Sequence, residues 1–153
     1  MIENIDDTDR AILKILQKDA TQSLESIAES VGVSLNTCWR RVQRLEQVGI
    51  IAGRVALLDA EKLGKSLTIF VSVRTNDHSK DWADRFAKAV ASKPEIVEFY
   101  RLAGDTDYLL KILAASVADY DRIYQSIISK VNLSDVTASF AMEKMKLTTE
   151  VPL

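Results

Sequence analysis

The sequence predicts an α+β protein, in which a three-helix (winged-type) helix-turn-helix domain precedes a ferredoxin-like βαββαβ sandwich. Apolar residues first recur every three to four positions, as in amphipathic helices. Further along, β-rich segments alternate with two helical ones. We expect residues 1–52 to form the first domain, 53–65 a linker strand and loop, and 66–153 the second domain.

Three short helices are predicted in the first domain. One spans residues 7–18, behind an acidic entry that suits a helix N-terminus. The next begins after Ser23 and stops at Gly32, since serine is a good N-cap and glycine a good C-terminal residue. The third follows the Gly32 to Ser34 turn and runs to Gly49. A tight turn before the third helix is typical of helix-turn-helix units.

The second domain is predicted to hold an antiparallel sheet with both helices on one face. The expected strands cover residues 67–74, 96–103, 108–114 and 136–145, and the expected helices 81–92 and 117–130. Alternation places Leu67, Ile69, Val71 and Val73 under the helices and turns Phe70 away from them. The second face is expected to carry Val97, Phe99, Leu109 and Leu113. A sheet with two apolar faces needs a second cover, so we expect a homodimer.

Composition excludes several classes of protein. The chain is 47% hydrophobic and 27% charged with five glycines and two prolines, which indicates a well-folded protein rather than a disordered one. A net charge of −2 argues against an unspecific basic coat and leaves room for a local basic patch. No signal peptide or membrane span is recognisable, so we expect a cytoplasmic protein without a membrane partner.

Enzymatic and metal chemistry find little support in the side chains. Cys38 and His78 are the only cysteine and histidine, which excludes an internal disulfide and the usual structural zinc site. No cofactor, metal or catalytic residue is therefore expected. Cys38 is predicted to be core. Trp39 borders the apolar stripe and is expected to pack against the first helix, with contact to the DNA backbone as the alternative.

The face of the third helix opposite its apolar stripe carries side chains of the types that read base edges. From composition alone, a solvated polar face in an ordinary three-helix cap is the alternative. Arginine can bond guanine O6 and N7, while asparagine and glutamine can bond adenine N6 and N7. Polar residues near the helix start or flanking this face can contact phosphates. The predicted DNA-binding residues are Ser34, Asn36, Thr37, Arg40, Arg41, Gln43, Arg44 and Gln47. We expect Arg40 to read a base and Arg41 to contact a phosphate. A dimer would select an imperfect palindrome of double-stranded DNA.

The chain resembles the Lrp/AsnC, or feast/famine, family of transcription regulators. The resemblance lies in the opening Ile5-Asp6-x-x-Asp9-x-x-Ile12-Leu13, in Val31-Gly32-Val33-Ser34 with Arg40-Arg41-Val42-x-Arg44-Leu45 after it, and in Gly104-Asp105-Thr106-Asp107-Tyr108. The ending Lys146-Leu147-Thr148-Thr149-Glu150-Val151-Pro152-Leu153 is also similar to the family. Together these motifs span nearly the whole chain.

The resemblance implies a function and a second site. It implies dimerisation through the α/β domains, further assembly often to octamers, and amino-acid effectors bound between dimers. The effector pocket it implies includes Gly104, Asp105, Asp107, Tyr108, Thr137 and Ser139. Exposed amides of a glycine-containing turn can meet an α-carboxylate, and an aspartate can meet an α-ammonium. From the residues alone, a plain β-turn is the alternative.

Two other functions remain as alternatives at this point. A ferredoxin-like dimer can be a small cofactor-free monooxygenase, although no catalytic group stands at a recognisable spacing in this sequence. The chain could also be an amino-acid-sensing co-regulator that does not bind DNA itself. The salt dependence of DNA binding separates this last alternative from a regulator that contacts phosphates.

Overall fold

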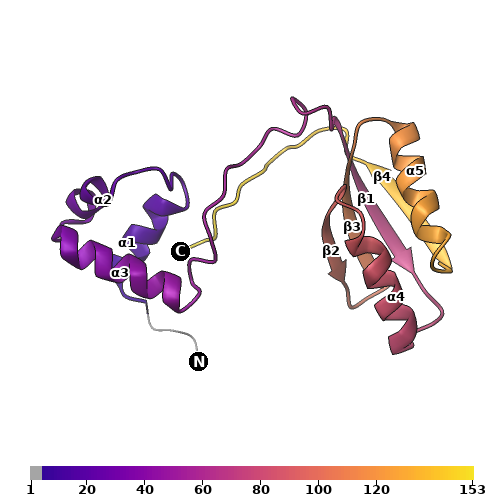
Figure 1. The fold of residues 1–153 in the computed structure, drawn as a ribbon, viewed down its shortest axis with the longest axis horizontal. Helices are drawn as coiled ribbons and strands as arrows, with labels where there is room; N and C mark the ends of the chain where they lie inside the picture. The colour runs from indigo at the N-terminus through magenta and orange to yellow at the C-terminus, as the bar shows by residue number, and fades with distance from the viewer. Residues whose placement is uncertain (1–4) are drawn as a thin grey trace. The chain divides into compact units, whose positions relative to one another are not determined.

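The computed structural model describes residues 5–153, so the first four residues of the predicted 1–52 domain lie outside it. The chain divides into two compact units. One unit contains the residues up to 57 together with 146–153, and the other contains 58–145 (Figure 1). The sequence had assigned the segment 146–153 to the second domain, whereas it groups here with the first unit.

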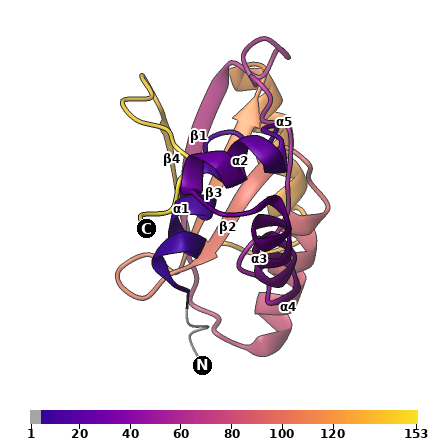
Figure 2. The same cartoon turned by 90° about the vertical axis from the view of Figure 1, so that its left-hand side faces the viewer.

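The first unit contains the three expected helices, α1 (Asp7–Leu16), α2 (Leu24–Val31) and α3 (Leu35–Gln47) (Figure 2). The second of these ends at Gly32, whose φ of 71° lies in the left-handed region where glycine carries no Cβ penalty. Two residues later Ser34 caps α3, because its hydroxyl accepts a hydrogen bond from the backbone N–H of Thr37 at 3.2 Å. The tight turn predicted from the sequence is therefore present.

A small apolar core holds the three helices together. Each helix contributes fully buried side chains: Ile12 from α1, Ile27 and Ala28 from α2, and Cys38 and Val42 from α3. Burial of large aliphatic side chains such as these stabilises a fold by about 1.5 to 3 kcal/mol each. The apolar stripes read from the sequence thus face one another, and the polar stripe of α3 faces outward.

The segment 146–153 is attached to α1 through one glutamine side chain. The Gln17 side chain accepts a hydrogen bond from the Val151 N–H at 2.9 Å and donates one to the Val151 carbonyl oxygen at 3.2 Å. A primary amide can satisfy both backbone groups of one residue in this way.

The linker strand predicted from the β-rich run at residues 50–58 is wrong for this chain. These residues form no strand, because no neighbouring strand within residues 5–153 is there to exchange hydrogen bonds with them. Several of their apolar side chains are consequently exposed, including Val55, Leu57 and Leu58.

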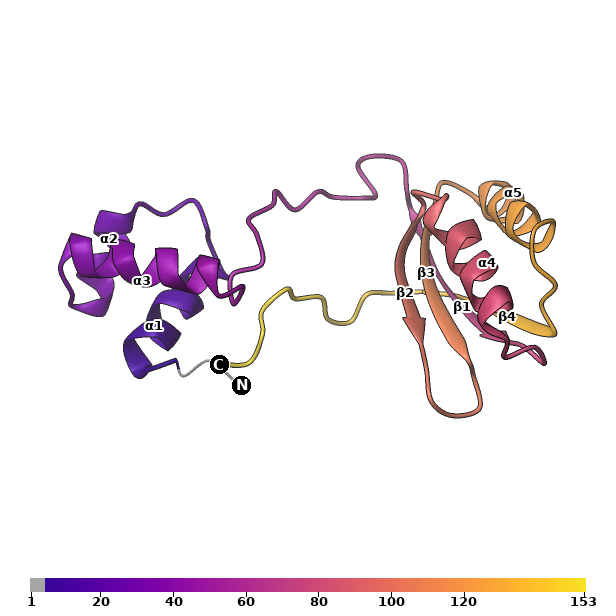
Figure 3. The same cartoon turned by 60° about the horizontal axis from the view of Figure 1, so that its bottom comes forward.

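The second unit is a four-stranded antiparallel sheet in the order β2-β3-β1-β4. Its strands are β1 (Leu67–Arg74), β2 (Ile96–Arg101), β3 (Tyr108–Ala114) and β4 (Asp135–Phe140). Helices α4 (Lys80–Ala91) and α5 (Val117–Ile128) cover one face of this sheet (Figure 3). The element order and the one-sided helical layer confirm the predicted ferredoxin-like fold.

An aromatic cluster fills the space between the sheet and α4. Phe86 of α4 meets the ring of Tyr108 edge-on at 5.2 Å between centroids, and Trp82 lies 5.1 Å from Phe86. As predicted, Ile69, Val71 and Val73 are buried on this face, while the intervening Phe70 is partly exposed on the other.

Phe99 lies on the opposite face from the one predicted. The pairing of β2 with β3 shifts between Ile96 and Glu98, so that one extra residue, Val97, is accommodated in a bulge. A one-residue bulge reverses the alternation beyond it. Phe99 therefore points toward the helices, where it stacks on Tyr108 at 5.6 Å, and Val97 remains exposed.

The last strand is shorter than the predicted 136–145. Its pairing with β1 runs as far as Ile69 opposite Phe140, followed by a hydrogen bond from the Ala141 N–H to the Thr68 carbonyl. Because β1 begins at Leu67, residues beyond Ala141 have no strand beside them.

None of the helices within residues 5–153 is long and apolar enough to cross a bilayer.

Candidate nucleic-acid interface and ligand-binding turn

The outward face of α3 carries the residues predicted to bind DNA. Asn36, Arg40 and Gln47 are exposed, and Gln43 is partly exposed and hydrogen-bonded to Glu46 at 3.2 Å. Ser34 and Thr37 lie at the start of the helix, with their hydroxyls 2.8 Å apart. The structure therefore brings all eight predicted residues onto one helix and its N-cap, with Cys38, Val42 and Leu45 buried behind them.

Two arginines of this face are bound to acids at the start of α1. Arg41 donates to both carboxylate oxygens of Asp6, at 2.9 and 2.7 Å, and to Asp9 at 2.9 Å. Arg44 forms an ion pair with the other oxygen of Asp9. We call these four residues the acid–arginine cluster.

The same two acids also form the N-terminal capping box of α1. The Asp6 carboxylate accepts from the Asp9 N–H at 2.9 Å, and the Asp9 carboxylate accepts from the Asp6 N–H at 3.1 Å. The sequence predicted only that an acidic entry suits this helix N-terminus, and it gave no signal for the capping box or for the arginine partners, which lie over thirty positions away. The helix start is therefore also the anchor of α3.

The two acids of the cluster differ in how far their side chains are buried. The side chain of Asp9 is 1% exposed, whereas that of Asp6 is 56% exposed. The pKa of Asp6 lies below its usual value, mainly because of the hydrogen bond from the Asp9 backbone and then because of Arg41. The Asp6 and Asp9 carboxylates in turn raise the pKa of Arg41. Both shifts keep the Asp6–Arg41 pair charged at neutral pH.

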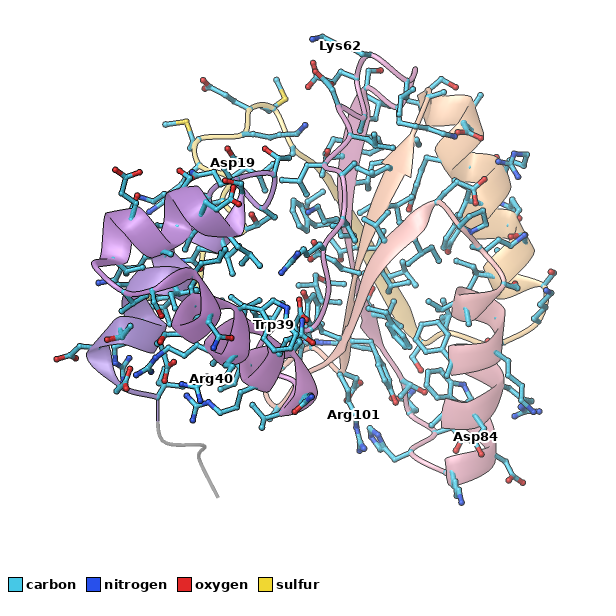
Figure 4. The ribbon with its side chains drawn as sticks, turned by 60° about the vertical axis from the view of Figure 1, so that its left-hand side comes forward. Asp19, Trp39, Arg40, Lys62, Asp84 and Arg101 are labelled. Carbon is cyan, nitrogen blue, oxygen red and sulfur yellow. The ribbon has the colours of Figure 1, made fainter. Side chains whose placement is uncertain are left out.

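Arg40 is an exposed residue of α3 (Figure 4). It differs from Arg41 and Arg44, because it forms no ion pair with any residue from 5 to 153. Together with Thr37 and the acid–arginine cluster it lines an open hollow of about 480 Å³. Trp39 is 49% exposed and lies outside the core cluster of the three helices, so its packing against the first helix stays a prediction. An exposed tryptophan beside an arginine that has no ion-pair partner within residues 5–153 is typical of a surface rather than of a core.

Cys38 is completely buried among the three helices. Burial raises the pKa of its thiol, which keeps the sulfur protonated and unreactive at neutral pH. Within residues 5–153 no group of three or more histidine, cysteine or acidic side chains could hold a metal ion.

The second predicted site centres on the turn between β2 and β3. The turn closes through a hydrogen bond from the Leu102 N–H to the Asp107 carbonyl at 2.8 Å. Asp107 is also tied to β1, because its carboxylate accepts from the Thr75 N–H at 2.8 Å. The Arg74 side chain donates to the Asp105 carbonyl oxygen. Gly104, with φ of 141°, adopts a conformation that other residues rarely take.

The remaining predicted effector residues are not all at this turn. The side chain of Tyr108 is buried in the aromatic cluster, so it can offer a ligand little besides its backbone. Thr137 and Ser139 are exposed on edge strand β4, opposite Ser72 and Phe70. Sequence reasoning missed Thr75, whose backbone N–H fixes the Asp107 carboxylate, since only the fold brings these two together.

Two protein families match the chain. The family described as Lrp/AsnC ligand binding domain matches residues 68–151, and the winged helix-turn-helix DNA-binding family matches residues 5–52. The chain is 50% identical to the glutamate uptake regulatory protein of Zymomonas mobilis, over all of this chain and 93% of that protein. It is 46% identical to the DNA-binding transcriptional activator DecR of Escherichia coli, over 97% of this chain and 99% of that protein.

A solved structure extends the similarity to the fold. A transcriptional regulator of Neisseria meningitidis in complex with L-methionine is 31% identical, with a TM-score of 0.92 over 97% of each chain. The chain therefore belongs to the Lrp/AsnC family of transcriptional regulators, which confirms the resemblance. Members of this family are regulators and not enzymes, so the monooxygenase alternative is set aside.

Replacing Asp9 by alanine should lower the free energy of unfolding of the first unit by about 2 to 3 kcal/mol. Breaking a fully buried ion pair typically costs about 3 to 5 kcal/mol. The expected cost is smaller here because both arginine partners are partly exposed. The loss combines an unpaired Arg44 guanidinium, one of the two carboxylate partners of Arg41, and half of the capping box. Urea unfolding followed by circular dichroism measures it. Asp7→Ala, at an exposed neighbouring acid, should cost less than about 1 kcal/mol. Equal unfolding curves for the two variants would contradict an anchoring role for Asp9.

Proposed function

We propose that this protein is a sequence-specific DNA-binding transcription regulator that reads the major groove with α3 and responds to an amino acid. The observation that carries the proposal is the polar face of α3, where Arg40 is exposed and unpaired among residues 5–153 while the opposite face is buried. The match of residues 5–52 to a DNA-binding family supports it. Because its target is DNA, we place the protein in the cytoplasm.

The residues on α3 divide into two roles. Arg40, with Asn36, Gln43 and Gln47 around it, is positioned to meet base edges in the major groove. Ser34 and Thr37, at the start of the helix, and the partly exposed Arg41 and Arg44 are suited to phosphates, because helix N-termini and guanidinium groups both attract anions.

Arg40→Ala should weaken binding to the selected duplex by about 1 to 3 kcal/mol and relax the preference at one base position. Fluorescence anisotropy on sequences from a binding selection measures both effects. The selection should return an imperfect palindrome with half-sites about 34 to 36 Å apart, or a multiple of that spacing. Arg85→Ala, at an exposed arginine of α4, is the matched control. If no inverted repeat emerged and Arg40→Ala bound like the wild type, a co-regulator without DNA binding would become the better interpretation.

The uncovered face of the sheet supports a homodimer. Register places Phe70, Leu109 and Leu113 on this face, with an ion pair of 2.7 Å between Lys111 and Glu98 among them. A partly apolar sheet face without a helical layer is suited to a second copy of itself. We propose that dimers formed in this way assemble further, to octamers.

Phe70→Glu should shift the protein toward smaller species in light scattering, because it places a charge at the centre of the proposed dimer interface. Val117→Glu, at an exposed apolar position on the helical side, provides the comparison and should keep the oligomeric state of the wild type. A monomeric wild type at micromolar concentration would contradict the proposed dimer.

The turn at residues 104–107 supports an amino-acid effector. Gly104 and Asp105 are exposed, and the Asp107 carboxylate has its second oxygen available beyond the hydrogen bond from Thr75. These groups can meet an α-carboxylate and an α-ammonium. The methionine complex of the Neisseria regulator is consistent with this class of ligand. Thr137 and Ser139 are proposed to complete the site.

Asp107→Asn should abolish the thermal stabilisation by whichever of the twenty amino acids stabilises the wild type, a gain of about 2.7 kcal/mol at a hundredfold excess over Kd. Asparagine keeps an oxygen to accept from the Thr75 N–H while removing the charge that an ammonium group needs. Asp84→Asn, at an exposed position of α4, should respond like the wild type. An unchanged response of Asp107→Asn would place the pocket elsewhere.

A further inference from the structure

The acid–arginine cluster is electrically neutral. Asp6 and Asp9 carry two negative charges, and Arg41 and Arg44 carry two positive ones. Of the three arginines that line the hollow beside α3, only Arg40 is left without a carboxylate partner among residues 5–153. The cationic surface offered to DNA is therefore much smaller than the number of arginines on the helix suggests.

Asp6 and Asp9 hold Arg41 by different means. Asp9 is buried and shared between two arginines, so it stays in place in the folded unit. Asp6 is mostly exposed and contacts Arg41 through a single guanidinium nitrogen. Exposed ion pairs of this kind are weak and are screened by salt. A phosphate presents oxygens of similar charge and geometry, so it can take the place of the Asp6 carboxylate.

We infer that Asp6 is a built-in competitor of DNA phosphate for Arg41, and that it sets the strength and salt dependence of DNA binding. The inference rests on the proposed DNA-binding function. When Arg41 turns to a phosphate, Asp6 loses its partner and attracts a cation from solution. The cation that Asp6 takes up offsets the cation that the phosphate releases. In the wild type, the contact between Arg41 and the phosphate therefore adds little to the salt dependence of DNA affinity.

Asp6→Asn tests this inference while preserving the helix. Asparagine is as good an N-cap as aspartate, so the side-chain oxygen still accepts from the Asp9 N–H and the capping box is kept. The variant removes the Asp6 charge that faces Arg41 and leaves the Asp9 carboxylate in place. Asp7→Asn is the matched control, because it removes the same charge at the next residue. The Asp7 side chain makes no hydrogen bond or ion pair within residues 5–153.

Anisotropy titrations of one duplex at several salt concentrations give the readout. Asp6→Asn should bind more tightly than the wild type at low salt, and its plot of log affinity against log salt should be steeper by about 0.9 per protomer. Between 50 and 200 mM salt it should therefore lose about 3.5-fold more affinity per protomer than the wild type. Asp7→Asn should follow the wild-type plot.

A double-variant cycle shows whether Asp6 acts through Arg41. In an Arg41→Ala background, Asp6→Asn should no longer steepen the salt dependence. If Asp6→Asn and Asp7→Asn gave the same plot, or if the effect of Asp6→Asn survived without Arg41, the inference would be wrong while DNA binding by the wild type stood. Failure of the wild type to bind any duplex would instead contradict the proposed function, and this inference with it.

Discussion

The DNA-binding unit depends on the ion pairs that the buried Asp9 carboxylate forms with Arg41 and Arg44. This carboxylate closes the first turn of α1 and at the same time holds two arginines of α3. A buried charge is tolerated only when its partners satisfy it, and here each oxygen has an arginine partner. The orientation of α3 relative to α1 is thus fixed by ionic geometry as well as by the small apolar core.

The second unit depends on a different constraint, the alternation of side chains along its strands. One face of the sheet packs the aromatic cluster against α4, and the other remains available. The bulge at Val97 transfers Phe99 from the open face to the core. Without that extra residue, the Phe99 ring would leave the aromatic cluster and lie on the open face of the sheet. The bulge therefore determines the composition of the proposed dimer surface.

Much of this architecture could be predicted from local pattern. The three helices of the first unit, the Gly32 turn and the βαββαβ order all follow from periodicity and from cap residues within a few positions. The bulge, the end of β4 and the unpaired run at 50–58 could not be predicted, because each depends on what lies beside a strand rather than within it.

The same distinction applies to the candidate sites. The polar face of α3 is a property of one helix, so the sequence was enough to identify its residues. The pairing of Arg41 with Asp6 joins α3 to the N-cap of α1. The hydrogen bond between Thr75 and Asp107 joins the residue after β1 to the residue before β3, so only the fold reveals these two contacts. The sequence identifies the residue types on the polar face of α3. The tertiary structure determines which of them are already paired with other residues of the chain.

The hydrogen bonds between Gln17 and Val151 affect the order in which the protein can be completed during synthesis. The sheet and its helices lie entirely within residues 58–145, so all of their parts are synthesised before residues 146–153. The helical unit is made first, yet it must wait for residues 146–153 to acquire its final contacts. The first unit can therefore make its contacts with Val151 only after the sheet and its helices have been synthesised.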